Sequence, residues 1–318
     1  MWFEANKIGF NDKVNHYRAF WKEDIVWNYV PDDNKIYYIS EDGSIINPKI
    51  YGNGGFGANI VSNTYTDGIG IITFDGPVTK IGVGTFQQKI KLTDIFIPAS
   101  VTSIYGHSFE STIINTIHLP KNVSNFDGMS CIYTNINCVS VDPENSTYEV
   151  YKGSIINKST KELIIGTNKS VLDSGISSIG AASFSNRQGI SSIIIPQGIT
   201  EIKAYTFSLS DLSSVVIPSS VTSIGREAFV ITELTSITIP SSVNKISQYA
   251  FLNCNNLVDI RVNATVPPTI PEPDGNNGSI FGPVGSVSGR QIKVPASKVN
   301  IYKKAAGWSY YASEIVAQ

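Results

Sequence analysis

The sequence predicts a β-rich solenoid, a chain wound into stacked coils that each add a short strand to a parallel sheet. Pro196, Pro218 and Pro240 recur at intervals of 22 residues. Aliphatic residues recur at every second position before each proline, as Val215 and Ile217 do in "LSSVVIP" at 212–218, which is the period of a strand with one buried face. One coil cannot cover its own apolar face, whereas stacked coils can, so the repeat itself indicates the architecture.

Each repeat carries its apolar residues in the same order. Three strand positions with the spacing L-x-x-L-x-L come first, and a proline closes the strand because it has no N–H to donate. Two apolar residues three apart follow, and then a phenylalanine. The period of 22–23 residues lies within the range of leucine-rich repeats, about 20–29 residues. The clearest copies span residues 92–109, 190–207, 212–229 and 234–251, and degenerate copies begin at Ile69 and at Ile114, where Cys131 takes the place of the phenylalanine.

The repeat divides the chain into three expected regions. Residues 1–62 have no repeat register and are predicted to cap the first coil, residues 63–270 form the solenoid, and residues 271–318 form a C-terminal cap with a last strand and a short helix. Ser297 is the expected N-cap of that helix. Residues 142–175 interrupt the period and predict a hairpin-like insertion, and the shared words "GSIIN" predict a related hairpin near residues 43–47.

Bulk composition excludes several classes of function. The net charge is −2, which disfavours nucleic acid because phosphates require basic patches. No run approaches the roughly 18 apolar residues of a membrane span. Cys131, Cys138 and Cys254 are too few for a disulfide framework or a zinc site. The first residues lack the apolar core of a signal peptide, so we expect either a trimmed mature chain or one that is not exported by that route.

The units "LxxIxIPxxVxxIGxxAF" resemble the BspA-like leucine-rich repeats of bacterial surface proteins. "VDPENSTYEVYKGSIINKSTKELI" within the insertion, and the ending "VPASKVNIYKKAAGWSYYASEIVA", are similar to segments of the same family. The resemblance implies a right-handed leucine-rich-repeat solenoid, surface attachment or secretion, and adhesion to proteins, cells or polymers. The asparagine ladder of ordinary leucine-rich repeats is missing, since serines follow the strand in the clearest copies.

No motif in the chain predicts catalysis, a cofactor or a metal ion. "GNGGFG" at 52–57 matches a dinucleotide-binding pattern but lacks the strand-to-helix context, so a flexible cap loop is the better interpretation. His16, His107 and His118 have no partner at metal-ligand spacing. The acid pairs lie in turns or far apart in the array, which disfavours a glycan-cleaving enzyme. We therefore expect a protein that is not an enzyme.

The candidate binding surface is a row of outward strand positions that stacking should align on the concave sheet. We call this row the concave stripe: Thr73, Phe96, His118, Ser140, Ile194, Val216, Thr238 and Arg261. Concave solenoid faces are the usual binding surface. Phe96, Ile194 and Val216 are apolar where water is expected, which indicates a contact patch. The alternative is that these side chains only suit a strand.

The expected function is that of a non-catalytic binding or adhesion module at the cell surface or outside the cell, with a protein or glycan partner. Neutral hydroxyl groups along the stripe suit such partners better than a polyanion. The alternative is a structural part of a larger assembly, such as a phage or prophage tail protein, in a cytoplasmic or virion-associated location. The absence of a signal peptide motivates that alternative.

Overall fold

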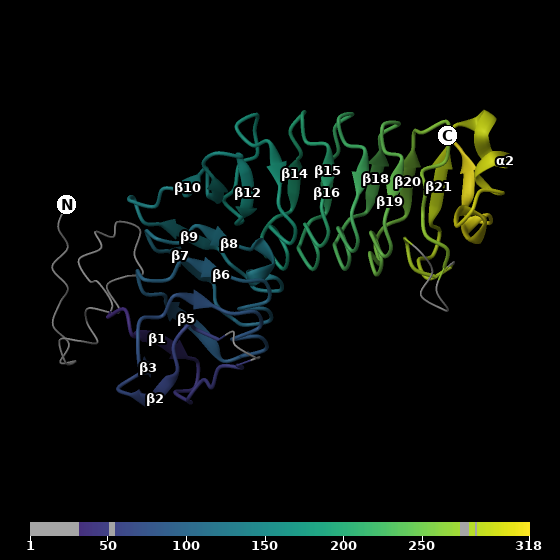
Figure 1. Cartoon of the computed structure of the whole chain (residues 1–318). Coiled ribbons are helices and arrows are strands. Elements are labelled where there is room, and N and C mark those ends of the chain that lie inside the picture. The colour runs from purple at the N-terminus through teal and green to yellow at the C-terminus, as the bar shows by residue number, and fades with distance from the viewer. Residues whose placement is uncertain (1–31, 51–54, 274–279, 284) are drawn as a thin grey trace.

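A computed structural model describes residues 32–50, 55–273, 280–283 and 285–318 of the chain. The coils form two stacks that meet at an angle, one running from β1 (Lys35–Ser40) to β9 (Cys138–Val141) and the other from β12 (Glu162–Ile165) to the C-terminus (Figure 1). Residues 1–31 and 51–54, which include most of the expected N-terminal cap, His16 and the start of "GNGGFG", lie outside the described residues.

Each regular coil contributes one strand to a front row, and these strands are the L-x-x-L-x-L segments of the sequence. They pair in parallel within the runs β7–β9, β14–β16 and β18–β20–β21. The front strands are β3 (Ile69–Phe74), β5 (Leu92–Phe96), β7 (Thr116–Leu119), β9 (Cys138–Val141), β14 (Ser192–Ile194), β16 (Ser214–Val216), β18 (Ser236–Ile239), β20 (Asp259–Val262) and β21 (Gln291–Val294). The predicted parallel solenoid sheet is confirmed.

The structure adds a second, shorter strand to most coils, after the proline. These two-residue strands form parallel back rows, β4–β6–β8 in the first stack and β15–β17–β19 in the second, whereas β13 pairs in parallel with the last strand of the insertion. They are β4 (Lys80–Ile81), β6 (Ser103–Ile104), β8 (Asn125–Phe126), β13 (Ser178–Ile179), β15 (Glu201–Ile202), β17 (Ser223–Ile224) and β19 (Lys245–Ile246). The second apolar pair of each repeat therefore also belongs to a hydrogen-bonded sheet.

The repeated phenylalanine lies in a tight turn that closes each coil. In the unit of Phe229, the backbone N–H groups of Glu227, Phe229 and Ile231 all donate to carbonyls of the next coil, at 2.8–3.1 Å. Glu227 and Ile231 reach this arrangement with left-handed backbone angles, φ 53° and 54°. The N–H groups of these three residues, two positions apart, thus all point along the solenoid axis. The same pair of positive φ values recurs in the turns of Phe86, Phe109, Phe184, Phe207 and Phe251.

The phenylalanine rings stack on one another along each solenoid core. In the second stack the ring centroids of successive residues are 5.2–5.4 Å apart, with interplanar angles of 3–23°, over Phe184, Phe207, Phe229, Phe251 and Phe281. In the first stack Phe86 and Phe109 are 5.9 Å apart. Offset-stacked rings attract one another beyond the burial of their area, so this column holds neighbouring coils in register.

The insertion separates the two stacks. It contains β10 (Tyr148–Tyr151), β11 (Ser154–Asn157) and β12 (Glu162–Ile165), which are antiparallel to one another in a four-stranded sheet that ends with β13, parallel to β12. Paired residues Ile155 and Ile165 belong to the core of the first stack, whereas the next pair, Ile156 and Leu163, belongs to the core of the second. Ile155 and Ile156 are neighbours on β11 and point to opposite faces, so this sheet acts as a partition between two hydrophobic cores.

On the turn side the two stacks touch directly. The Arg187 side chain is fully buried there and donates to the carbonyl oxygens of Gly166 and Ser185, both at 2.7 Å, and of Thr134 across the junction. A Cβ on Gly128 would lie 3.1 Å from the Ala181 carbonyl oxygen, so glycine permits this close approach. The end of the insertion takes part in this contact through the Gly166 carbonyl.

The motif "VDPENSTY" fastens the insertion to the coil before it. The buried Asn145 amide donates to the carbonyls of Pro120 and Val123, at 2.8 and 3.0 Å, and its oxygen accepts from the backbone of Thr147 and Tyr148. The Tyr148 hydroxyl accepts from the Phe126 N–H at 2.9 Å. Side chains here replace the backbone partners that a following coil would supply.

The N-terminal segment enters the front sheet from outside the repeat. β1 (Lys35–Ser40) lies between β3 and β5 and is antiparallel to both, and β2 (Ile60–Thr66) covers the other edge of β3. Residues 43–47 contain no strand, so the hairpin expected there from "GSIIN" is wrong. In the insertion the same sequence contains β11, because β10 and β12 pair with it on either side.

The C-terminal end closes the second stack with β21, β22 (Ile315–Ala317) and three short helical turns, η4 (Ala296–Lys298), α2 (Val299–Tyr302) and η5 (Trp308–Tyr311). A further 3₁₀ turn, η2 (Gly128–Cys131), lies in the first stack. Ser297 does not cap α2: it lies inside η4, and α2 has no side-chain cap. The proline before η4 already starts the turn one residue earlier.

A buried ion pair holds this end together. Arg290 Nε and Nη2 donate to the two carboxylate oxygens of Glu314 at 2.8 and 3.1 Å, and Nη1 donates to the Phe281 carbonyl at 2.7 Å. Both side chains are almost completely buried. The remaining carboxylate capacity is used by the Gly285 N–H, at 2.9 Å.

We expect Glu314→Gln to lower the free energy of unfolding by about 3 kcal/mol, because it leaves the buried Arg290 guanidinium without its counter-charge. Urea unfolding followed by circular dichroism measures the change. Glu149→Gln, which removes a solvent-exposed pair with Lys161, is the matched control and should cost less than about 1 kcal/mol. Equal losses in the two variants would contradict the role assigned to the buried pair.

Candidate functional site

The second stack carries an exposed apolar pair on its front row. Ile194 and Val216 are direct partners in the parallel pair β14–β16, with 68% and 54% of their surfaces exposed. Ile193 and Val215, one residue earlier, face the core side. β14 pairs only with β16 among the described strands, so the apolar pair begins at a sheet edge where the insertion interrupts the row.

The same row continues into a charged end. Arg261 pairs with Thr238 on one side and with Lys293 on the other. Asp259, two residues before Arg261 on β20, receives both cations: its carboxylate lies 3.0 Å from Lys293 Nζ and 3.7 Å from Arg261 Nη2. Two cations and one carboxylate leave a net positive charge. Along the row the exposed side chains are therefore first apolar, at Ile194 and Val216, then a hydroxyl, at Thr238, and finally cationic, at Arg261 and Lys293.

In the first stack, His118 and Ser140 are paired in β7–β9, and His118 Nδ1 lies 2.9 Å from Ser140 Oγ. Burial lowers the pKa of His118 to about 4, and the charge of Asp142 only partly opposes this. The imidazole is therefore neutral at physiological pH. It contributes a polar packing contact to the concave stripe and no cationic site.

Thr73 and Phe96 do not continue the stripe as neighbours. β1 separates them, so Thr73 is paired with Lys35 and Phe96 with Tyr37. Phe96 is half-buried and packs in a small apolar cluster with Tyr37, Ile69 and Ile71. The concave stripe thus consists of separate groups, and the structure does not join Phe96 to the Ile194–Val216 pair.

Three residues of the row were missed by sequence reasoning. Lys293 and Val316 extend it beyond Arg261 through β21 and β22, and Tyr37 enters it from β1. The strand "QIKV" already indicated Lys293, since its Lys occupies the outward position between two buried aliphatics. Nothing in the sequence indicated Tyr37, because an inserted antiparallel strand has no repeat register.

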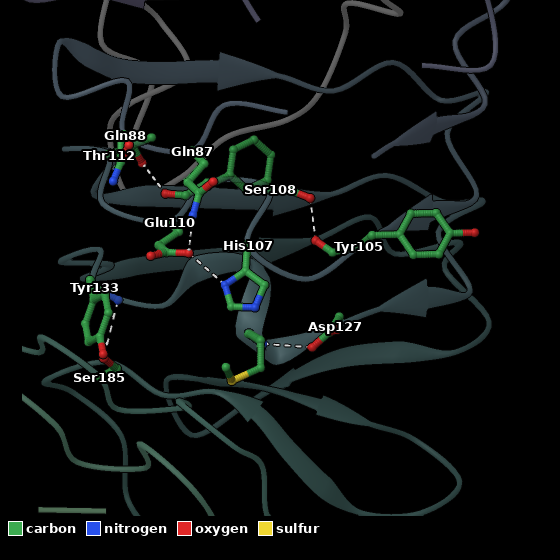
Figure 2. A network of polar contacts seen from close by, with 12 residues as sticks. Gln87, Gln88, Tyr105, His107, Ser108, Glu110, Thr112, Asp127, Tyr133 and Ser185 are labelled. Carbon is green, nitrogen blue, oxygen red and sulfur yellow. Dashed lines mark hydrogen bonds and ion pairs between the residues drawn. The ribbon is translucent and has the colours of Figure 1, made fainter. Parts of the chain in front are cut away.

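A second group of polar and aromatic side chains lies on the phenylalanine-turn side. Glu110 Oε2 accepts from Gln87 Nε2 at 2.8 Å and lies 2.7 Å from His107 Nδ1 (Figure 2). Tyr133 follows on the neighbouring turn, where its backbone N–H donates to Ser185 Oγ across the junction. Sequence analysis assigned His107 no role, and the structure gives it a partner inside its own turn.

The remaining features offer little chemistry. Cys131 and Cys254 are buried, Cys138 is exposed, and burial raises the pKa of the Cys131 thiol to about 11. No group of three metal-ligating side chains occurs in the described parts of the chain. A small polar cavity of about 230 Å³ lies between the loop 167–170 and the start of β14. Across the described residues, no helix has the length and apolar character needed to cross a membrane.

The coil geometry and the repeat spacing together define a leucine-rich-repeat solenoid protein. The BspA type leucine-rich repeat region matches residues 63–174 and 166–269 in six copies, and this chain belongs to that family. None of the curated proteins matches the sequence.

Two solved structures share the fold. The pneumococcal vaccine antigen PcpA superposes with a TM-score of 0.58 at 17% identity, over 76% of this chain and 66% of that one. A leucine-rich cell surface protein from Faecalibacterium prausnitzii gives 0.52 at 19% identity, over 76% of this chain and 56% of that one. This chain therefore spans less than two thirds of the length of either structure.

The pKa of His118 predicts a pH dependence of stability. The unfolded chain takes up a proton near pH 6.5, whereas the folded chain does so only near pH 4. Between these values the unfolded state binds more protons, so stability is lost as the pH falls. We expect the free energy of unfolding of His118→Asn to fall less steeply over this range than that of the wild type. Urea titrations at several pH values measure both slopes, and equal slopes would contradict the buried neutral imidazole.

Proposed function

We propose that this chain is a non-catalytic binding module of a bacterial surface or secreted protein and that it engages a protein or glycan through the front row of its second stack. Membership of the BspA-type family supports the class of function. The two structural relatives are described as a vaccine antigen and as a cell surface protein, which supports the location.

One observation carries the proposed site: Ile194 and Val216 are adjacent and mostly exposed on a sheet whose other face is the core. Neither side chain contributes to folding in proportion to its apolar area, because that area remains in water. A partner that covers the pair would recover this hydrophobic free energy. Exposed apolar groups with a polar surround are typical of protein interaction sites.

The neighbouring positions narrow the partner's chemistry. Thr238 offers a hydroxyl group, and Arg261 and Lys293 add positive charge that Asp259 only partly balances. A partner segment lying across the strands would meet apolar, hydroxyl and cationic groups in that order. This sequence of groups favours a ligand with an apolar part followed by acceptor or acidic groups.

We expect the double variant Ile194→Asp with Val216→Asp to lose about tenfold or more in affinity for whatever the wild type binds on an array of matrix proteins and polysaccharides. Both positions are exposed, so melting followed by circular dichroism should stay unchanged. The matched control is Val83→Asp with Ile90→Asp, two exposed aliphatics in a turn outside the row. Equal binding by the wild type and the Ile194/Val216 variant would reject the proposed surface.

A further inference from the structure

The junction between the stacks brings together aromatic side chains that are distant in sequence. The rings of Tyr133, in the first stack, and Tyr205, in the second, meet edge to face at 6.4 Å and 86°. On the next coils, Arg226 lies over the Tyr249 ring at 5.2 Å and donates to Gln248 Oε1 at 2.7 Å. Tyrosine and arginine are enriched in protein interfaces and in their energetic hot spots, and the front row has a different, hydroxyl-rich composition.

Two carboxylates belong to the same group. Glu110 contacts His107 and Gln87, and Glu227 Oε1 accepts from Arg226 Nε at 2.9 Å. Their side chains are only 17% and 19% exposed. We call Tyr133, Tyr205, Arg226, Glu110 and Glu227 the junction cluster. With one arginine and two glutamates, these five residues carry one net negative charge.

Both carboxylates act on the Tyr133 phenol. Burial raises the pKa of Tyr133 to about 12; the negative charge of Glu227, Tyr205 and the negative charge of Glu110 add to this effect, and the positive charge of Arg226 partly opposes it. Charges from both stacks therefore converge on one aromatic ring. A negative potential next to the electron-rich face of tyrosine favours a cation.

Several members of the cluster occupy costly backbone positions. Tyr133, Tyr205 and Glu227 have φ values of 60°, 59° and 53°. Tyr205 and Glu227 precede the repeated phenylalanine by two residues, and the coil of Phe86 has Gly84 at that position, at φ 63°. Glycine adopts this region without the cost of about 1 kcal/mol or more that other residues incur. Large side chains at these positions must be offset by what they contact.

We propose that the junction cluster binds a basic segment of a protein partner, with a lysine or arginine side chain against the Tyr133 ring and within reach of the Glu110 and Glu227 carboxylates. Arg226 shows the same chemistry inside the chain, because its guanidinium combines a tyrosine face with a glutamate. A neutral saccharide would use the rings but would gain nothing from the charge of the carboxylates.

This surface is separate from the front row of the proposed function. It lies on the phenylalanine-turn side of the coils, so failure of one site does not imply failure of the other. It also depends on the bend: the ring contact between Tyr133 and Tyr205 crosses the point where the insertion interrupts the array.

The probe is a peptide of alternating arginine and glycine, titrated into the full chain at low salt and measured by isothermal titration calorimetry. We expect saturable binding that weakens about tenfold in Glu110→Gln with Glu227→Gln and about fivefold in Tyr133→Leu. Tyr133→Phe, which keeps the ring, should bind like the wild type. Circular dichroism establishes that each variant is folded.

The matched control is Glu144→Gln with Glu201→Gln, which removes the same charge from two exposed sites elsewhere. It should leave binding within twofold of the wild type, beyond the weak long-range effect of net charge. Equal weakening in the two double variants would overturn the proposal, as would the absence of peptide binding. Binding of a neutral oligosaccharide that depends on Tyr133, without peptide binding, would also overturn it.

Discussion

The structure depends on the burial of a repeated aromatic ring against the ring of the next coil. A coil of about 22 residues has no interior of its own, so its apolar side chains are covered only from above and below. The phenylalanines of the second stack meet this requirement at nearly constant spacing. Their backbone N–H groups donate to the following coil in the same turn, so ring stacking and hydrogen bonding fix one register together.

The insertion changes this regularity in a specific way. It supplies two opposite apolar faces, Ile155 with Ile165 and Ile156 with Leu163, and so ends one core and begins another. On the turn side the coils remain in contact through the buried Arg187, without a carboxylate partner among the described residues. The junction cluster lies where these two stacks meet, because Tyr133 belongs to the first stack and Tyr205 to the second.

The repeat made most of the fold predictable, because spacing alone identifies which residues face the core. The front strands, the closing prolines and the buried phenylalanines follow from it. The errors lie where the repeat gives no information. Phe96 occupies an outward position, yet β1 covers it with Tyr37, and no periodic signal announced β1. Ser297 has the chemistry of an N-cap, but Pro295 starts the turn first.

The candidate sites also include contacts that the repeat predicts and contacts that it does not. The pairing of Ile194 with Val216 and of Thr238 with Arg261 could be predicted, since each pair is one repeat apart. The contact between Tyr133 and Tyr205 could not, because it depends on the angle at which two stacks meet. Local patterns specify neighbours within an array, whereas the geometry of an interruption depends on packing of the whole insertion.

The most direct test of two separately closed stacks is amide hydrogen exchange, measured by mass spectrometry, on Phe229→Leu. Removing one ring from the second column should lower protection in coils of that stack, over residues 176–262, while residues 69–141 keep the protection of the wild type. Loss of protection by the same factor on both sides of the insertion would show a single cooperative core and would contradict the partition.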